Sequence, residues 1–270
     1  MSRISGCMKI LREKNEKALV AFITAGDPDL AATREIFAVI EKNGADVIEL
    51  GVPFSDPLAD GPVIQLASQR SLKSGTSLEK IIQLVKEIRQ GSDLPIVLMS
   101  SFNPVFVYGE KRFVDDAVSA GVDGVILPDL PPEEAGDFAS YADGKGLDMI
   151  FLVAPTSSAK RVKMISEMSR GFIYYISLTG VTGVRSALPD GLEAKVSVVK
   201  AASPLPVMIG FGVSSPDIAC QAAAISDGVI VGSAIVKLIA DCNDPRERLD
   251  RVGDFVNSVK RSMAGIGNAE

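Results

Sequence analysis

The chain has 270 residues, 47% of them hydrophobic, and its formal net charge is −6. This length allows a sizeable core, and α/β barrels of about this size are commonly one domain. The acidic balance, without any basic run, argues against a nucleic-acid surface. The apolar runs are too short to span a bilayer, and the N-terminus lacks the apolar segment of a signal peptide. We therefore expect a soluble cytoplasmic protein with no membrane partner.

Histidine is absent from the sequence. Because histidine is the usual general base near neutral pH, Ser-His-Asp and Cys-His mechanisms are excluded within this chain. Proton transfer must then come from Asp, Glu, Lys, Tyr or Cys. The three cysteines, Cys7, Cys220 and Cys242, are widely spaced and indicate neither a disulfide framework nor a zinc site. We expect no metal in this chain.

Strand and helix signals alternate along the chain after a short polar helix at about residues 2–15. Asp27-Pro28 suits an N-cap and first helical residue, and Gly44 suits the end of that helix. A final helix is predicted from residue 244 to about residue 263. Further helix starts are indicated by a capping box at residues 76–79, by Glu133-Glu134 and by residues 214–216. The predicted strands are residues 21–26, 47–51, 95–100, 124–129, 149–155, 172–177, 206–212 and 228–232.

Eight apolar strands alternating with helices predict a parallel sheet closed into a (β/α)₈, or TIM, barrel with an extra N-terminal helix. An open doubly wound sheet is the alternative, although that fold usually has fewer strands. No linker or charge block marks a second domain, so residues 1–270 are expected to form a single domain. The active site of such a barrel lies at the C-terminal ends of the strands.

The stretch from Val47 to Gly61 carries the clearest candidates for chemistry. Glu49 interrupts an apolar strand, and Asp60 follows eleven residues later in a loop. Alternation along the strand would point Glu49 into the barrel, with Ile48 and Leu50 facing the helices. A salt bridge at the strand end is the plainer interpretation of Glu49, but its place near the C-terminal end favours catalysis.

Two glycine clusters end later strands, Gly210-Phe211-Gly212 and Gly232-Ser233. Glycine allows backbone N–H groups to approach an anion, and the helix that starts at Ser233 adds a favourable field. Loops after the seventh and eighth strands often hold phosphate in barrels, so we predict a phosphate site here. Residues 179–186, rich in glycine and threonine, could form a lid over a ligand.

Two other barrel mechanisms are disfavoured. No lysine lies near the C-terminal end of a predicted strand, so a Schiff-base aldolase lacks its nucleophile. A metal-dependent hydrolase is disfavoured by the absence of histidine. A magnesium site built only from Asp and Glu stays open, but Glu49, Asp56 and Asp60 alone would be few ligands for it.

Over essentially its whole length the chain resembles the tryptophan synthase α subunit family. The residues that carry the resemblance are A-F-I-T-A-G-D-P (21–28), E-L-G-V-P-F-S-D-P-L-A-D-G-P (49–62), G-V-T-G (180–183), G-F-G-V-S (210–214) and G-S-A-I-V (232–236). The resemblance implies a TIM barrel that cleaves indole-3-glycerol phosphate into indole and glyceraldehyde 3-phosphate. It also implies an α₂β₂ complex with a β subunit that joins indole to serine, and pyridoxal phosphate in that partner rather than a cofactor in this chain.

The resemblance also implies roles for individual residues. The catalytic carboxylates are Glu49 and Asp60. The substrate contacts are Phe22, Tyr175 and Thr182, with Thr182 meeting Asp60 from the lid. The phosphate site is Gly183, Gly212, Gly232 and Ser233, and the positions facing the β subunit are Pro53, Asp56 and Asn103.

The residues and the resemblance predict the same retro-aldol mechanism. Glu49 would protonate the indole ring and take a proton from the neighbouring hydroxyl, while Asp60 would accept a hydrogen bond from the indole N–H. We expect an apolar setting to raise the pKa of Glu49 and loop solvation to keep Asp60 ionised. Three alternatives remain: a stand-alone lyase that releases free indole, a different phosphate-binding barrel such as an epimerase, and a non-catalytic activating partner.

Overall fold

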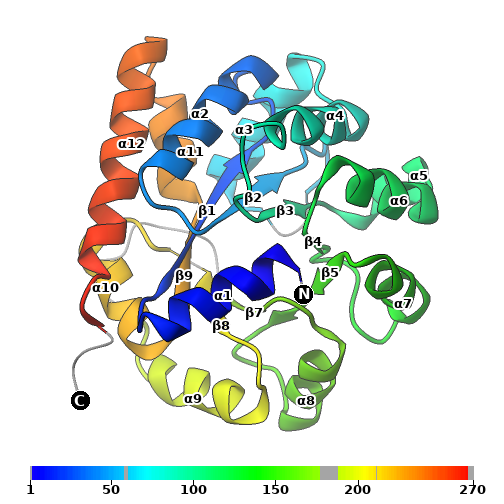
Figure 1. Ribbon diagram of the computed structural model, residues 1–270, viewed down its shortest axis with the longest axis vertical. Helices are drawn as coiled ribbons and strands as arrows, with labels where there is room; N and C mark the ends of the chain where they lie inside the picture. Colours follow the sequence, from blue (N-terminus) through cyan, green and yellow to red (C-terminus); the bar gives the residue numbers. More distant parts are fainter. Residues whose placement is uncertain (1, 58–59, 177–187, 211, 267–270) are drawn as a thin grey trace.

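A computed structural model describes residues 2–57, 60–176, 188–210 and 212–266. These residues form one sheet of parallel strands surrounded by helices (Figure 1). The strands are β1 (Ala18–Thr24), β2 (Val47–Gly51), β3 (Ile96–Met99), β4 (Gly124–Ile126), β5 (Asp148–Ile150), β6 (Leu152–Val153), β7 (Ile173–Ile176), β8 (Val207–Gly210) and β9 (Gly228–Val231). The first helices are α1 (Arg3–Glu13), α2 (Leu30–Lys42), α3 (Pro62–Lys73), α4 (Leu78–Ile88), α5 (Phe102–Tyr108) and α6 (Glu110–Ala120). The later helices are α7 (Gly136–Lys145), α8 (Ala159–Met168), α9 (Leu192–Ala202), α10 (Pro216–Ile225), α11 (Ser233–Ala240) and α12 (Pro245–Ser262).

The predicted barrel is confirmed, with its fifth strand divided in two. The hydrogen-bonded order runs β5-β4-β3-β2-β1-β9-β8-β7-β6. The segments β5 and β6 are separated only by Phe151, and β5 bonds to β4 while β6 bonds to β7. The covalent chain through Phe151 therefore joins the two ends of the hydrogen-bonded sheet and closes the barrel. Each of the eight predicted strands has a counterpart in the structure.

Side chains alternate between two cores, as the pleat of a strand requires. Ile48 and Leu50 belong to a large outer core between sheet and helices. Val20 and Val47 belong to a smaller inner core together with Ile4 of α1. The helix α1 was predicted only as a short polar helix, yet its apolar face packs against the interior of the barrel at the N-terminal ends of the strands.

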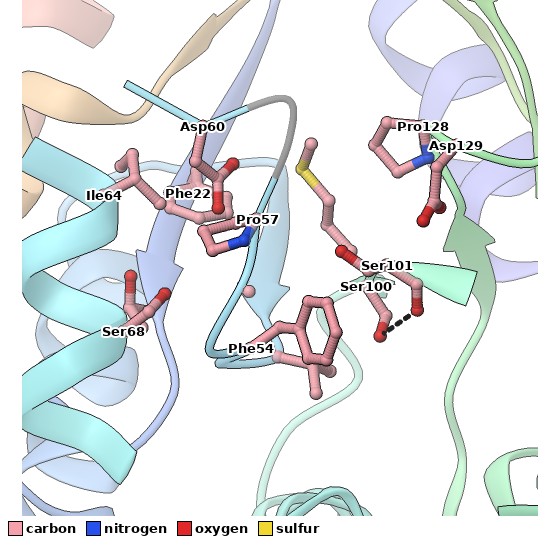
Figure 2. A pocket seen from close by; sticks show the side chains of 14 residues that line it. Phe22, Phe54, Pro57, Asp60, Ile64, Ser68, Ser100, Ser101, Pro128 and Asp129 are labelled. Carbon is pink, nitrogen blue, oxygen red and sulfur yellow. Dashed lines mark hydrogen bonds between the residues drawn. The ribbon is translucent and has the colours of Figure 1, made fainter. Parts of the chain in front are cut away.

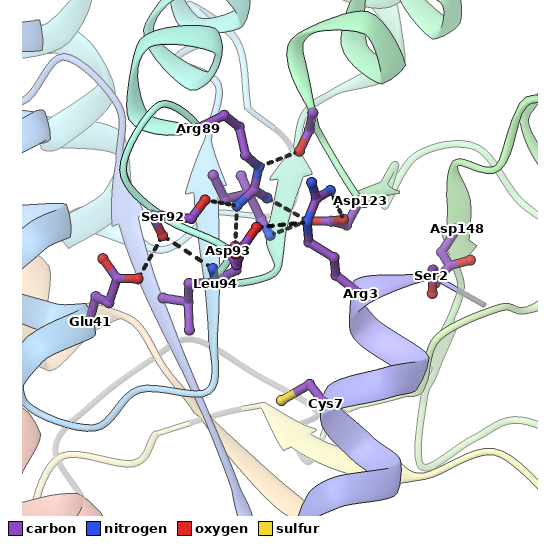
Figure 3. Close-up of polar contacts among 12 residues, drawn as sticks. Ser2, Arg3, Cys7, Glu41, Arg89, Ser92, Asp93, Leu94, Asp123 and Asp148 are labelled. Atoms are coloured by element: carbon purple, nitrogen blue, oxygen red, sulfur yellow. Dashed lines mark hydrogen bonds and ion pairs between the residues drawn. The ribbon is translucent and has the colours of Figure 1, made fainter.

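Polar contacts hold α1 in this position (Figure 3). Ser2 caps the helix by accepting the N–H of Ser5, and its hydroxyl donates to Asp148 at 2.5 Å. Arg3 forms an ion pair with Asp123 at 3.0 Å. The N-terminal end of the barrel is therefore closed by a helix that the sheet itself anchors.

Several predicted helix starts need correction. The N-cap of α2 is Asp29 rather than Asp27, because the carboxylate of Asp27 is held by Arg70 at 2.7 and 2.8 Å. The N-cap of α4 is Ser77, one residue after the position expected from the capping box. The helix α7 starts at Gly136 instead of the Glu133-Glu134 pair. Starts at Ser215 and Asp244, and the positive φ of Gly44 after α2, are confirmed. Among the described helices, none is both long and apolar enough to cross a membrane.

Candidate active site

Glu49 lies in β2 with its side chain inside the barrel, beside Phe22 of β1 and Val97 of β3 in register. It is fully buried, and neither carboxylate oxygen has a hydrogen-bond partner among the described residues. Burial raises the pKa of Glu49 to about 8, and the charge of Asp60 adds to the shift. An unpaired ionised carboxylate in such a place is strongly disfavoured. Glu49 is therefore protonated at neutral pH and can act as a proton donor.

Asp60 lies just before α3 and lines a pocket at the C-terminal ends of the strands (Figure 2). Gln65 donates a hydrogen bond to its backbone carbonyl at 2.9 Å. Burial raises the pKa of Asp60 as well, so solvation of the loop is weaker than the sequence suggested. The two carboxylates influence each other, because the charge of Asp60 is one of the causes that raise the pKa of Glu49.

Phe22 lies inside the pocket, and two glycines make room for its ring. A Cβ atom on Gly51 would lie 2.5 Å from Cζ of Phe22, and one on Gly232 would lie 3.3 Å from Cδ1. Contacts as short as the first are not tolerated, so any side chain at position 51 would displace the ring. The predicted role of Phe22 in a substrate pocket is consistent with this position.

The position of the tyrosine pair in β7 corrects one predicted site residue. Tyr175 does not line the pocket, because its side chain is buried in the outer core between sheet and helices. Tyr174 instead packs with the inner core, and burial together with the charges of Glu49 and Asp60 raises its pKa. The ring of Tyr174 covers the backbone of Gly210, where a Cβ would lie 2.3 Å from it. Alternation in the strand allows only one of the two tyrosines to face the carboxylates.

The predicted phosphate residues are partly brought together. The strands β8 and β9 pair with Gly210 opposite Ile230, so the segments that carry Gly212 and Gly232 leave the sheet side by side. Gly232 is the N-cap of α11, and Ser233 is its first residue. Gly212 has a φ of +59°, a backbone conformation that favours glycine. The fourth predicted phosphate residue, Gly183, and the predicted substrate contact Thr182 lie outside the described residues.

The three residues predicted to face a partner differ in exposure. Asp56 and Asn103 are exposed, but Pro53 is buried and offers little surface to a partner. Near Asn103 on α5, Phe106 is 62% exposed and Val107 is 76% exposed. No sequence pattern marks this apolar pair, although exposed large apolar side chains are a common sign of an interface.

This arrangement defines a (β/α)₈ barrel with a pocket at the C-terminal ends of its strands and two carboxyl groups, Glu49 and Asp60, whose pKa values are raised by burial. The sequence profile of the family described as tryptophan synthase alpha chain matches residues 8–264. The chain belongs to this family, and it is a lyase of tryptophan synthesis.

Relatives and solved structures agree with this assignment. The tryptophan synthase alpha chain of Geobacter sulfurreducens is 54% identical over 268 residues, which cover 99% of this chain and 100% of the relative. The crystal structure of the alpha chain from Legionella pneumophila has a TM-score of 0.91 and 38% identity, and covers 100% of both chains. A chain in the tryptophan synthase complex from Pyrococcus furiosus has a TM-score of 0.82 and 35% identity, covering 90% of this chain and 98% of that one.

Proposed function

We propose that Glu49 is the acid and base of a retro-aldol cleavage of indole-3-glycerol phosphate to indole and glyceraldehyde 3-phosphate. The observation that carries this assignment is the complete burial of an unpartnered carboxyl group whose pKa is raised to about 8. A group of this kind holds a proton at neutral pH and is close enough to its pKa to take one back. The position inside the barrel also keeps competing water away from the proton.

The proposed step conserves protons. Glu49 donates its proton to C3 of the indole ring, which turns the ring into a better leaving group. The resulting carboxylate takes the proton of the hydroxyl on the adjacent carbon. The bond between that carbon and C3 breaks, its electron pair returns to the indole, and the former hydroxyl carbon becomes the aldehyde of glyceraldehyde 3-phosphate.

Asp60 would stabilise the charge that appears during this step. Protonation at C3 places positive charge on the indole nitrogen, and a carboxylate that accepts the N–H hydrogen bond stabilises it where it develops. Burial raises the pKa of Asp60 and so disfavours its ionised form. The positive charge that develops on the ring would act in the opposite direction and favour the ionised carboxylate. Phe22 would pack against the indole ring, and Tyr174, which packs with the inner core, would contact the substrate instead of Tyr175.

The phosphate of the substrate would bind beside the start of α11. Gly212, Gly232 and Ser233 offer backbone N–H groups without bulky side chains, and the N-terminus of a helix favours an anion. Gly183 would complete this site, and Thr182 would meet Asp60. No group of three or more His, Cys, Asp or Glu residues that could hold a metal ion occurs among the described residues.

The proposed partner is a tryptophan synthase β subunit in an α₂β₂ complex, with pyridoxal phosphate bound to the partner. The solved Pyrococcus furiosus protein is a tryptophan synthase complex, and one of its chains shares the fold of this one. The exposed residues Asp56, Asn103, Phe106 and Val107 lie near the pocket end of the barrel and would form part of the contact. The whole chain, residues 1–270, would act as a single barrel domain in this complex.

One assay tests the proposal: release of indole from indole-3-glycerol phosphate, measured with and without a β subunit. We expect slow release of indole by the isolated chain and faster release in the complex. Positioning of the loop that carries Asp60 can change a rate by orders of magnitude. Full activity of the isolated chain, unchanged by a β subunit, would indicate a stand-alone lyase instead. Absence of indole release in both conditions would exclude the proposed reaction.

A further inference from the structure

The residues of one wall of the pocket have no role in the proposed mechanism. Figure 2 shows Ser100, Ser101 and Asp129 on one side of the pocket, and Asp60 and Ile64 on the other. The two serines follow β3, and Asp129 follows β4 shortly after its last residue. A pocket that bound only an apolar ring at this wall would need no polar side chains there.

The fold itself does not use the hydroxyl of Ser101. Ser101 is the N-cap of α5, where a serine oxygen ordinarily accepts the N–H of the second or third helical residue. The third residue here is Pro104, which has no N–H, and the side chain of Ser101 makes no cap hydrogen bond. Asp129 Oδ1 accepts the N–H of Phe102 at 2.8 Å in its place. The start of the helix is thus capped from the neighbouring strand, which leaves the Ser101 hydroxyl available to a ligand.

The neighbouring side chains define what such a ligand must carry. The hydroxyl of Ser100 is occupied, because it donates to the carbonyl of Ser101 at 2.8 Å. Asp129 is exposed at the wall, and its second carboxylate oxygen can accept a further hydrogen bond. The wall therefore offers one hydroxyl that can donate or accept and one carboxylate that only accepts. A ligand group that donates a hydrogen bond fits both, whereas an anionic group would be repelled.

We propose that Ser101 and Asp129 form a subsite for a hydroxyl or amino group on the six-membered ring of the indole moiety. The inference rests on the proposed function, in which Asp60 accepts the indole N–H from the opposite wall. The ring edge across from the nitrogen then faces Ser101 and Asp129, and carbon 5 lies on that edge. The protein should accordingly favour an indole with a hydroxyl at carbon 5 over one with a methyl group there, which has a similar size but cannot form hydrogen bonds.

The test uses the reverse reaction, in which the protein condenses an indole with glyceraldehyde 3-phosphate. The kcat/KM values of 5-hydroxyindole and 5-methylindole are measured with the wild type, with Ser101→Ala and with Ser68→Ala. Ser68 lines the same pocket on α3, on the side of Asp60, and so provides the matched control. The ratio of the two kcat/KM values is compared between variants, because the intrinsic reactivities of the two indoles cancel in that comparison.

We expect Ser101→Ala to lower the preference for 5-hydroxyindole by about three- to tenfold, the range for one neutral hydrogen bond. Ser68→Ala should leave the preference as it is in the wild type. The proposal is overturned if the preference is the same in the wild type and Ser101→Ala, if Ser68→Ala lowers it equally, or if neither substituted indole is accepted. Unsubstituted indole distinguishes failure of the subsite from failure of the proposed reaction. If the wild type cannot condense unsubstituted indole, the proposed function itself fails.

Discussion

Three carboxylates at the N-terminal end of the barrel are paired, whereas Glu49, near the C-terminal end, has no hydrogen-bond partner among the described residues. Asp46, Asp123 and Asp227 stand directly before β2, β4 and β9, and each accepts a backbone N–H at the start of the neighbouring strand, at 2.7, 2.8 and 2.9 Å. Each of the three also forms an ion pair with a basic residue distant in sequence. Their respective partners are Lys260, Arg89 and Lys200.

At the C-terminal end, Glu49 has no hydrogen-bond partner among the described residues, and burial raises the pKa of both Glu49 and Asp60. The same chemical group therefore stabilises the fold where it is paired, and in the proposed mechanism it transfers protons where it has no partner. Paired carboxylates fix the register of the strands. Unpaired buried ones lower the stability of the fold, which is the expected condition of groups that must exchange protons.

The largest expected effect comes from removing the proton of Glu49. Glu49→Gln keeps the shape of the side chain, so we expect the fold to survive and the rate of indole release to fall by at least about 10²–10⁴-fold, the usual contribution of a general acid or base. Glu35→Gln on the exposed surface of α2 is the matched control and should keep the wild-type rate. Near-normal turnover by purified Glu49→Gln would remove Glu49 from the mechanism.

At the opposite end, the expected effect is on stability rather than chemistry. Asp123→Ala leaves the buried Arg89 without its main partner and removes the acceptor of the Ile96 N–H (Figure 3). We expect the free energy of unfolding to fall by about 3–5 kcal/mol in a denaturant titration, the range for breaking one side of a buried ion pair.

The control at this end is Asp93→Ala. Asp93 belongs to the same cluster, but its side chain is 100% exposed and its ion pair with Arg3 spans 3.8 Å. An exposed pair of this kind contributes little, so the variant should unfold like the wild type. Equal losses in Asp123→Ala and Asp93→Ala would contradict the view that burial and pairing together give the N-terminal end its stability.

The sequence predicted the elements at the C-terminal end better than the contacts at the N-terminal end. The alternation of side chains along an apolar strand is enough to place Glu49 inside the barrel. This prediction needs only the neighbouring residues of the same strand. The ion pair between Asp46 and Lys260 joins residues 214 positions apart, and no local pattern indicates it. The packing of α1 against the barrel interior is likewise a tertiary feature.

The error at β7 has a physical cause of the same kind. Tyr174 and Tyr175 are adjacent, so one faces the barrel interior and the other faces the helices, and composition alone does not say which. The register against β8, with Tyr174 opposite Met208 of the inner core, decides it. The prediction of Asp27 as an N-cap is wrong for a similar reason. Its carboxylate binds Arg70, which lies 43 residues further along the chain, so no local pattern indicates this contact.

The buried carboxyl group of Glu49 should make the stability of the fold depend on pH. The pKa of Glu49 is about 8 in the folded protein and near 4.5 in an unfolded chain, so the folded state binds more protons between these pH values. The free energy of unfolding should therefore fall as pH rises through this window. We expect the wild type to lose about 3 kcal/mol between pH 5 and 8 relative to Glu49→Gln, which has no ionisable group at this position. Parallel stability curves of the two proteins would show that Glu49 is not the buried titrating group.

The smallest expected effect compares two buried hydroxyl groups, one at each end. Thr24 lines the pocket and is 2% exposed, and its Oγ1 has no hydrogen-bond partner among the described residues. Ser226, just before the aspartate that precedes β9, is fully buried and donates to the carbonyls of Ala222 and Gly228 at 2.7 and 2.9 Å. A buried hydroxyl without a partner destabilises a fold, whereas one with partners stabilises it.

Thr24→Val keeps the shape of the side chain and removes only the unpaired hydroxyl, so the free energy of unfolding should rise by about 1 kcal/mol. Ser226→Ala removes a hydroxyl that is fully satisfied and should lower it by about 1 kcal/mol. Denaturant titrations of the two variants beside the wild type measure both signs in one experiment. If both substitutions destabilise the protein to a similar degree, Thr24 has a partner in solution, and the contrast would be limited to Glu49 and the three paired aspartates.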